Sequence, residues 1–64
     1  MKARYIKTMD FTFEDVEILG VSSEKELLQK MDKGKIIKIN NEEQIEYINT
    51  SYVMYFALDK GEIS

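Results

Sequence analysis

Few stretches of this chain hold side chains that could take part in catalysis. The tetrapeptide Ser22-Ser-Glu-Lys25 fits the S-x-x-K pattern of acyltransferases that use a serine nucleophile. However, Ser23 is followed three residues later by Glu26, which is the spacing of a capping box at the start of a helix. The sequence has no histidine or cysteine, so the usual proton shuttle, the thiolate nucleophile and the best transition-metal ligands are missing. We therefore predict that the protein is not an enzyme.

Carboxylates are the remaining candidates for binding a metal ion. Acidic side chains gather at a predicted turn that contains Glu42, Glu43 and Glu46. A calcium-binding loop has a fixed spacing of converging oxygen ligands and a central glycine, and the turn lacks this spacing. The three glycines of the chain fall at the ends of predicted elements and form no phosphate-binding loop. The sequence therefore predicts no metal and no cofactor.

The charges are unevenly distributed along the chain, whose net charge is −3. Residues 10–26 hold six acids and one lysine. Such a segment suits the presentation of carboxylates to a basic groove on another protein, although an acidic segment can also serve only as a solubilising surface. We expect Glu14, Asp15 and Glu17 to steer a basic partner.

A basic cluster follows the acidic segment. It consists of Lys30, Lys33, Lys35 and Lys38. In an alternative hypothesis, the chain binds a small ligand or a nucleic acid, these lysines hold phosphates, and Tyr47 or Tyr52 stacks on a base. The negative net charge and the single arginine argue against nucleic-acid binding, because phosphate contacts need a basic face and base recognition favours arginine.

The elements that position these residues begin with residues 4–19, where apolar side chains alternate with polar ones as in a half-buried strand. The alternation changes parity after Glu14-Asp15, which a strand cannot do without a bulge, turn or break. Either a hairpin turns near Met9 to Thr12 or one long strand kinks at Glu14-Asp15. The pattern favours the hairpin.

A helix and further strands follow. Ser23 and Gly34 delimit the predicted helix, since they suit its amino-terminal cap and the position just beyond its carboxyl end. Strands are predicted at residues 35–40, 44–49 and 52–58. The sequence therefore predicts one α+β domain over residues 1–64: a small antiparallel sheet of about four to five strands with one short helix, in the order strands, helix, strands.

The last strand, YVMYFAL, is apolar at every position, so both of its faces need cover. We expect Tyr52, Met54, Phe56 and Leu58 to lie beneath the helix. The opposite sheet face is predicted to carry Ile36, Ile48, Val53, Tyr55 and Ala57. In a chain of 64 residues the core is small, so an apolar face of this kind favours a homodimer or another protein partner as its cover. The alternative is that the N-terminal strands close over this face as a small barrel or sandwich.

The N-terminal stretch lacks the apolar run of a signal peptide, and no segment approaches the length of a membrane span. We therefore expect a cytoplasmic protein with no membrane partner.

The run SSEKELLQKMDKGKIIKI, followed by YINTSYVMYF, resembles a loose class of very short, uncharacterised proteins of Gram-positive bacteria and their phages. The resemblance covers about Val21 to Phe56 and implies a strand hairpin, a capped helix, a Gly-Lys-x-Ile strand and a Tyr-Ile-Asn-Thr turn before the last strand. It brings no catalytic residues. It implies an accessory role inside a bacterial cell, such as inhibiting or regulating a host defence protein.

Overall fold

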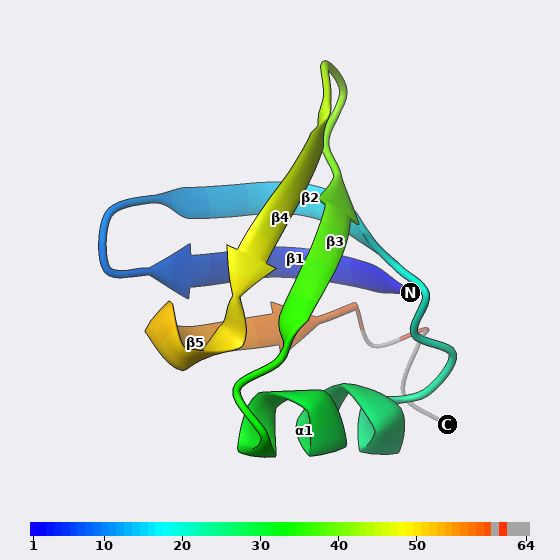
Figure 1. Cartoon of the computed structure of the whole chain (residues 1–64). Coiled ribbons are helices and arrows are strands. Elements are labelled where there is room, and N and C mark those ends of the chain that lie inside the picture. Colours follow the sequence, from blue (N-terminus) through cyan, green and yellow to red (C-terminus); the bar gives the residue numbers. More distant parts are fainter. Residues whose placement is uncertain (60, 62–64) are drawn as a thin grey trace.

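The computed structural model describes residues 1–59 and 61 and consists of five strands and one α-helix (Figure 1). The elements are β1 (Lys2–Thr8), β2 (Thr12–Leu19), α1 (Glu24–Asp32), β3 (Ile36–Asn40), β4 (Ile45–Asn49), the 3₁₀ turn η1 (Thr50–Tyr52) and β5 (Val53–Leu58). All strand pairs are antiparallel. The predicted α+β class, the order of elements and the N-terminal hairpin are therefore confirmed.

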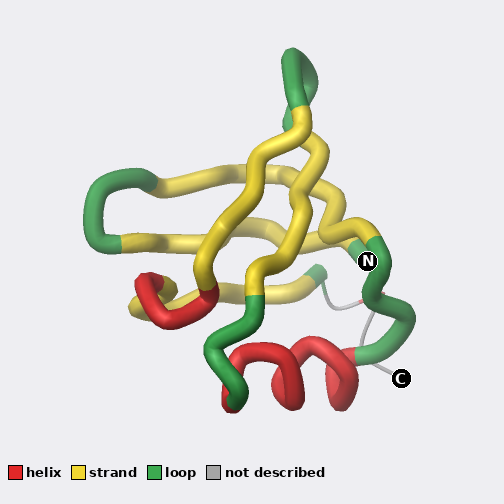
Figure 2. The backbone as a smooth tube through the Cα atoms, viewed as in Figure 1, coloured by secondary structure: helices red, strands yellow, loops and turns green. Residues whose placement is uncertain are grey.

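The sheet is bent into two layers because β2 pairs with a different strand along each of its halves. The strand order is β4-β3-β2-β1-β5. Residues 12–17 of β2 pair with β1, and residues 17–19 pair with β3. As a result the β3–β4 hairpin crosses over the layer formed by β1, β2 and β5, and its tip projects beyond the rest of the molecule (Figure 2).

The change of parity seen in the sequence has a structural cause at Asp15. This residue has a φ of 51°, in the left-handed region that non-glycine residues adopt rarely and aspartate tolerates better than most. Before it, Phe13 packs against the core, and after it Val16 is buried. In β1, the pairing with β5 shifts register between Ala3 and Tyr5, opposite the same point of β2. The hairpin and the kink are therefore both present, although the sequence offered them as alternatives.

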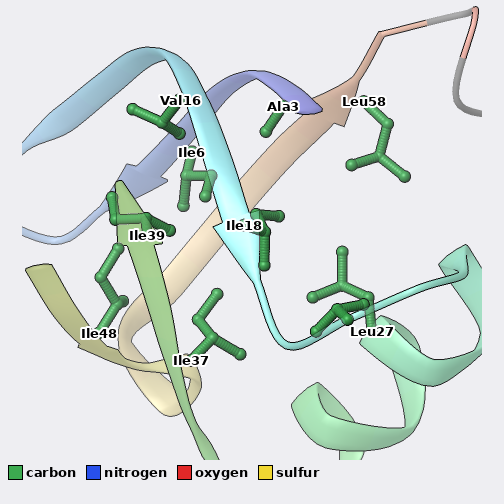
Figure 3. Close-up of a cluster of buried hydrophobic side chains, with 10 residues drawn as sticks. Ala3, Ile6, Val16, Ile18, Leu27, Ile37, Ile39, Ile48 and Leu58 are labelled. Carbon is green, nitrogen blue, oxygen red and sulfur yellow. The ribbon is translucent and has the colours of Figure 1, made fainter. Parts of the chain in front are cut away.

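The core lies between the two layers, and the chain covers it by itself (Figure 3). The cluster consists of Ala3, Ile6, Val16, Ile18, Val21, Leu27, Ile37, Ile39, Ile48 and Leu58. Every strand contributes to it, and α1 adds Leu27, which is fully buried. The N-terminal strands thus close over the second sheet face, although the sequence favoured an outside partner as its cover. The core needs no outside cover.

Four predicted side-chain directions are wrong in the C-terminal part of the chain. Ile48 is only 6% exposed because it pairs with Ile37 on the inner face of the β3–β4 hairpin, whereas we expected it on an open face. In β5, the pairing with β1 shifts register around Met54. Val53 therefore joins Phe56 and Leu58 in packing toward the core, and Met54 is exposed. Tyr52, expected beneath the helix, lies exposed in η1.

Helix α1 begins at the predicted Ser23 cap, but the side chain of Glu26 bonds Ser22 and not Ser23. The Ser23 hydroxyl accepts a hydrogen bond from the Glu26 N–H at 3.2 Å. The Glu26 carboxylate in turn accepts from the N–H of Ser22 at 2.8 Å and from the Ser22 hydroxyl at 3.1 Å. These bonds, the backbone one above all, hold the pKa of Glu26 below its ordinary value. The charged cap therefore stabilises the fold above the ordinary pKa, and this contribution is lost as the pH falls through the lowered pKa.

Ile39 and Ile36 offer a matched test of the two-layer core, because they lie on opposite faces of β3. Ile39 is fully buried and Ile36 is 62% exposed. We expect Ile39→Ala to lower the free energy of unfolding by about 2–5 kcal/mol, and Ile36→Ala to change it by less than about 0.5 kcal/mol. Urea denaturation followed by circular dichroism measures both. Equal losses in the two variants would contradict this arrangement of the strand.

Candidate protein-interaction groove

A hollow of about 310 Å³ lies between the β1–β2 turn and the segment that joins β4 to β5. One wall is formed by Met9, Asp10 and Phe11 of the turn, and the other by Glu46 and Tyr47 of β4 and Tyr52 of η1. Phe13 and Ile48 also line it and connect it to the core. We call this hollow the aromatic groove. In Figures 1 and 2 the β1–β2 turn and η1 lie on the same side of the molecule.

The aromatic groove gathers much of the apolar surface that the fold leaves open. Nine large apolar side chains are exposed in the described part of the chain, and four of them line this hollow. Met9, Phe11, Tyr47 and Tyr52 are between 56% and 68% exposed. Concave surfaces lined by aromatic residues and methionine are typical of binding sites, and such residues are enriched at protein interfaces.

The wall formed by the β1–β2 turn is held by Thr8, which is largely buried. Its hydroxyl accepts from the N–H of Phe11 at 3.0 Å and from the N–H of Asp10 at 3.4 Å, and it donates to the Phe11 carbonyl at 3.1 Å. The Thr8 N–H donates to the same carbonyl at 2.8 Å. The Phe11 backbone is thus fixed, so the turn presents its side chains without first having to order.

The opposite wall is held by η1. The Asn49 side chain accepts from the N–H of Ser51 at 2.9 Å and so caps the 3₁₀ turn. Thr50 is buried and donates to the Lys35 carbonyl both from its N–H, at 3.1 Å, and from its hydroxyl, at 2.5 Å. Gly34, with a φ of 65°, lies so close that a Cβ there would be 2.9 Å from the Ser51 Oγ. These contacts tie Tyr52 to the segment between α1 and β3.

The charge of the aromatic groove is negative. Asp10 and Glu46 stand on opposite walls, and no lysine or arginine lines the hollow. The Glu46 carboxylate accepts a hydrogen bond from the Gln44 side chain, which fixes its position on β4. The arrangement combines apolar rings with carboxylates, so it suits a ligand that has both apolar surface and positive charge.

The structure separates the five apolar residues that were predicted to form one interface. Ile36 and Tyr55 are exposed, but they lie on β3 and β5, with β2 and β1 between these strands. Ile48 is buried, while Val53 and Ala57 are partly buried. The Tyr55 ring meets the Tyr5 ring edge to face, with centroids 5.7 Å apart. These residues therefore do not form a continuous patch.

The three predicted steering acids are also divided. Glu14 and Asp15 line a shallow hollow together with Arg4, Tyr5, Thr12 and Tyr55. Glu17 instead accepts from the Met1 amino group, which also donates to the Ile18 carbonyl at 2.9 Å. Asp15 additionally has its structural role at the bend of β2. Glu14 and Asp15 thus share one hollow, beside Arg4, and Asp15 and Glu17 share another, beside Lys2, so a cation of the same chain stands in each.

The lysine cluster is brought together in part. Lys30, Lys33 and Lys35 line one hollow at the end of α1, beside Glu26 and Gln29. Lys38 lies apart on the outer face of β3, with its Nζ 6.0 Å from the centroid of the Tyr47 ring. Of the two tyrosines that were expected to stack on a base, Tyr47 therefore has one of the four lysines beside it, whereas Tyr52 lines the aromatic groove, which no lysine lines. The elements of the phosphate-binding hypothesis therefore do not share one site.

The sequence predicted the turn near Met9 to Thr12 but did not indicate that Met9 and Phe11 would line a candidate site there. The run Thr8-Met-Asp-Phe11 is the sequence feature that could have indicated this position of the two side chains. A threonine three residues before the end of a turn can bond the backbone as an ST turn. This run places two large apolar side chains at a turn, where they cannot reach the core. Apolar residues at a turn of this kind are candidates for contact with a partner.

No protein-family model, curated protein or solved structure matches the chain. Among residues 1–59 and 61, no helix is long and apolar enough to cross a membrane. Within the same residues, metal-ligating side chains do not gather in groups of three or more.

Thr8→Val should remove the hydrogen bonds of the β1–β2 turn while keeping the shape of the side chain. We expect it to lower the free energy of unfolding by about 1–3 kcal/mol, because the Phe11 N–H loses its partner. The control is Thr12→Val, at an exposed threonine for which the expected change is below about 0.5 kcal/mol. Urea denaturation gives both values, and a Thr8→Val variant as stable as its control would contradict this role of the hydroxyl.

Proposed function

We propose that this protein is a non-enzymatic protein-binding module that uses the aromatic groove to bind a short segment of another protein. The observation that carries the proposal is the gathering of Met9, Phe11, Tyr47 and Tyr52 around one hollow whose two walls are held by hydrogen bonds from backbone N–H groups to side chains. A site that is ordered before binding loses less conformational entropy when its partner arrives. The groove therefore combines apolar contact area with walls that are ordered before binding.

The chemistry of the groove favours a protein segment over a nucleic acid. Binding of single-stranded nucleic acid combines aromatic platforms with a positive groove that follows the phosphates. Here the aromatic rings are accompanied by Asp10 and Glu46, which would repel phosphates. The nearest counterpart of a phosphate site, the hollow with Lys30, Lys33 and Lys35, is lined by other elements and contains no aromatic side chain.

The biological setting of the proposal comes from the resemblance to short proteins of Gram-positive bacteria and their phages. Under this proposal the partner is a bacterial protein, and the module inhibits or regulates it by occupying one of its segments. A small protein without catalytic residues can act in this way, because occupation of a surface is enough to block a competing contact. The compartment would be the bacterial cytoplasm.

Tyr52 and Tyr55 provide a matched pair for testing the groove. They are three residues apart and are 56% and 53% exposed, but only Tyr52 lines the aromatic groove. We would select peptides from a displayed library of random 12-residue sequences on the native protein and measure their affinities by fluorescence polarisation. We expect Tyr52→Ser to weaken binding at least about tenfold, as for a central interface tyrosine, and Tyr55→Ser to leave it unchanged.

Two results would overturn the proposed function. One is a selection in which the folded native protein enriches no peptide more strongly than a surface without protein does. The other is a set of selected peptides whose affinities fall equally with Tyr52→Ser and Tyr55→Ser, since that would place their contacts outside the groove. Circular dichroism of each variant verifies that the fold is kept.

Self-association is a second candidate, and the edge strand β5 favours it. β5 pairs with β1 on one side only, and an open strand edge can pair with a second copy. Met54 and Tyr55 add exposed apolar surface beside this edge. This candidate uses Tyr55 from the interface predicted from the sequence and leaves the aromatic groove free for another protein.

Light scattering over a concentration series measures the mass that this second candidate predicts. We expect a dimer for the native protein and a monomer for Tyr55→Lys, because the new ammonium groups would be buried or brought close together at the edge. Leu28→Lys is the control, since Leu28 is an exposed apolar residue on α1, and it should remain a dimer. A native protein that is monomeric at all concentrations would exclude the dimer.

A further inference from the structure

We propose that the aromatic groove recognises a positively charged side chain of its partner, with arginine preferred over lysine. This inference rests on the proposed function, since it specifies the chemistry of the segment that the module binds. It requires a partner segment in which a basic residue is flanked by apolar ones. The apolar neighbours would contact Met9 and Phe11, and the basic side chain would lie between the two acidic walls.

The charge in the groove favours a cation. Asp10 and Glu46 belong to elements far apart in the sequence, and the fold brings them to opposite walls of one hollow. The other side chains that line it are uncharged, so neither carboxylate has a cation of the groove itself as a partner. A guanidinium or ammonium group placed between the walls would therefore meet two carboxylates and no repelling charge.

The aromatic rings of the groove also favour a cation. Phe11 and Tyr52 are both exposed, and the face of an aromatic ring attracts a cation within about 6 Å of its centroid. The Tyr47 ring already has a cation of the protein itself beside it on the outer face of the β3–β4 hairpin, because the Nζ of Lys38 lies 6.0 Å from its centroid. Lys38 itself does not line the groove, so it does not fill the space offered to a ligand.

The preference for arginine follows from the combination of rings and carboxylates. A guanidinium is planar, so it can stack on a ring while its edge donates hydrogen bonds to a carboxylate. It is also more weakly hydrated than an ammonium, which lowers the cost of moving it into a partly apolar hollow. A lysine would keep the attraction of charge but would lose the stacking and the forked hydrogen bonds.

The experiment uses the peptides selected on the native protein from the random 12-residue library. Arginine should be enriched at one position of the selected sequences. Its replacement by citrulline, which keeps the shape and removes the charge, should weaken binding about tenfold, and replacement by lysine about two- to fivefold. Asp10→Asn and Glu46→Gln should each weaken binding about two- to fivefold. The control Glu43→Gln, at an exposed acid of the β3–β4 turn outside the groove, should leave binding unchanged.

The outcomes separate this inference from the function on which it rests. Peptides that need Tyr52 but show no basic residue, or bind equally well with citrulline, would overturn the inference and leave the proposed function standing. The same holds for affinities that Asp10→Asn and Glu46→Gln leave unchanged. A selection that yields no peptide would overturn both. Weaker binding at higher salt for the arginine peptides, and unchanged binding for their citrulline versions, is the further result expected.

Discussion

The fold depends on the double pairing of β2, which hydrogen-bonds to β1 through one half and to β3 through the other. A sheet of five short strands with a single helix cannot bury both of its faces if it stays open. The bend at Asp15 lets one continuous sheet form two layers, so the inner faces of β1, β2 and β5 meet those of β3 and β4. The whole core follows from this arrangement, and α1 needs to contribute only Leu27 to it.

The same arrangement explains where the candidate site lies. Crossing of the β3–β4 hairpin over the other layer brings η1 and Tyr47 beside the β1–β2 turn. The side chains at this junction are apolar, but the core is already complete without them, so they line an open hollow. Hydrogen bonds of Thr8 on one wall and of Asn49 and Thr50 on the other keep this hollow in shape. The shape of this hollow is thus a consequence of how the sheet closes.

Local features of the structure could be predicted from the sequence, because they depend on near neighbours. The helix with its Ser23 and Glu26 cap, the hairpin near Met9 and the α+β class all follow from patterns within a few residues. Side-chain directions that depend on strand pairing could not be predicted from the sequence. Ile48 points inward because of its register with Ile37, and Met54 points outward because of a register shift against β1. The alternation of residues within one strand carries no information on the register of strand pairing. For this reason the residues of the predicted interface lie apart in the structure, and the sequence did not predict the aromatic groove.

Nuclear Overhauser effects between isoleucine methyl groups would test most directly that the chain closes over its own core. Ile6 of β1 and Ile39 of β3 belong to one cluster and come from different layers (Figure 3). The measurement is made on a mixture of labelled and unlabelled protein, which separates contacts within a chain from contacts between chains. The closed sheet predicts an intramolecular effect between these two methyl groups. An effect seen only between chains, or none in the folded protein, would show that the second face is covered by a partner and would contradict the account.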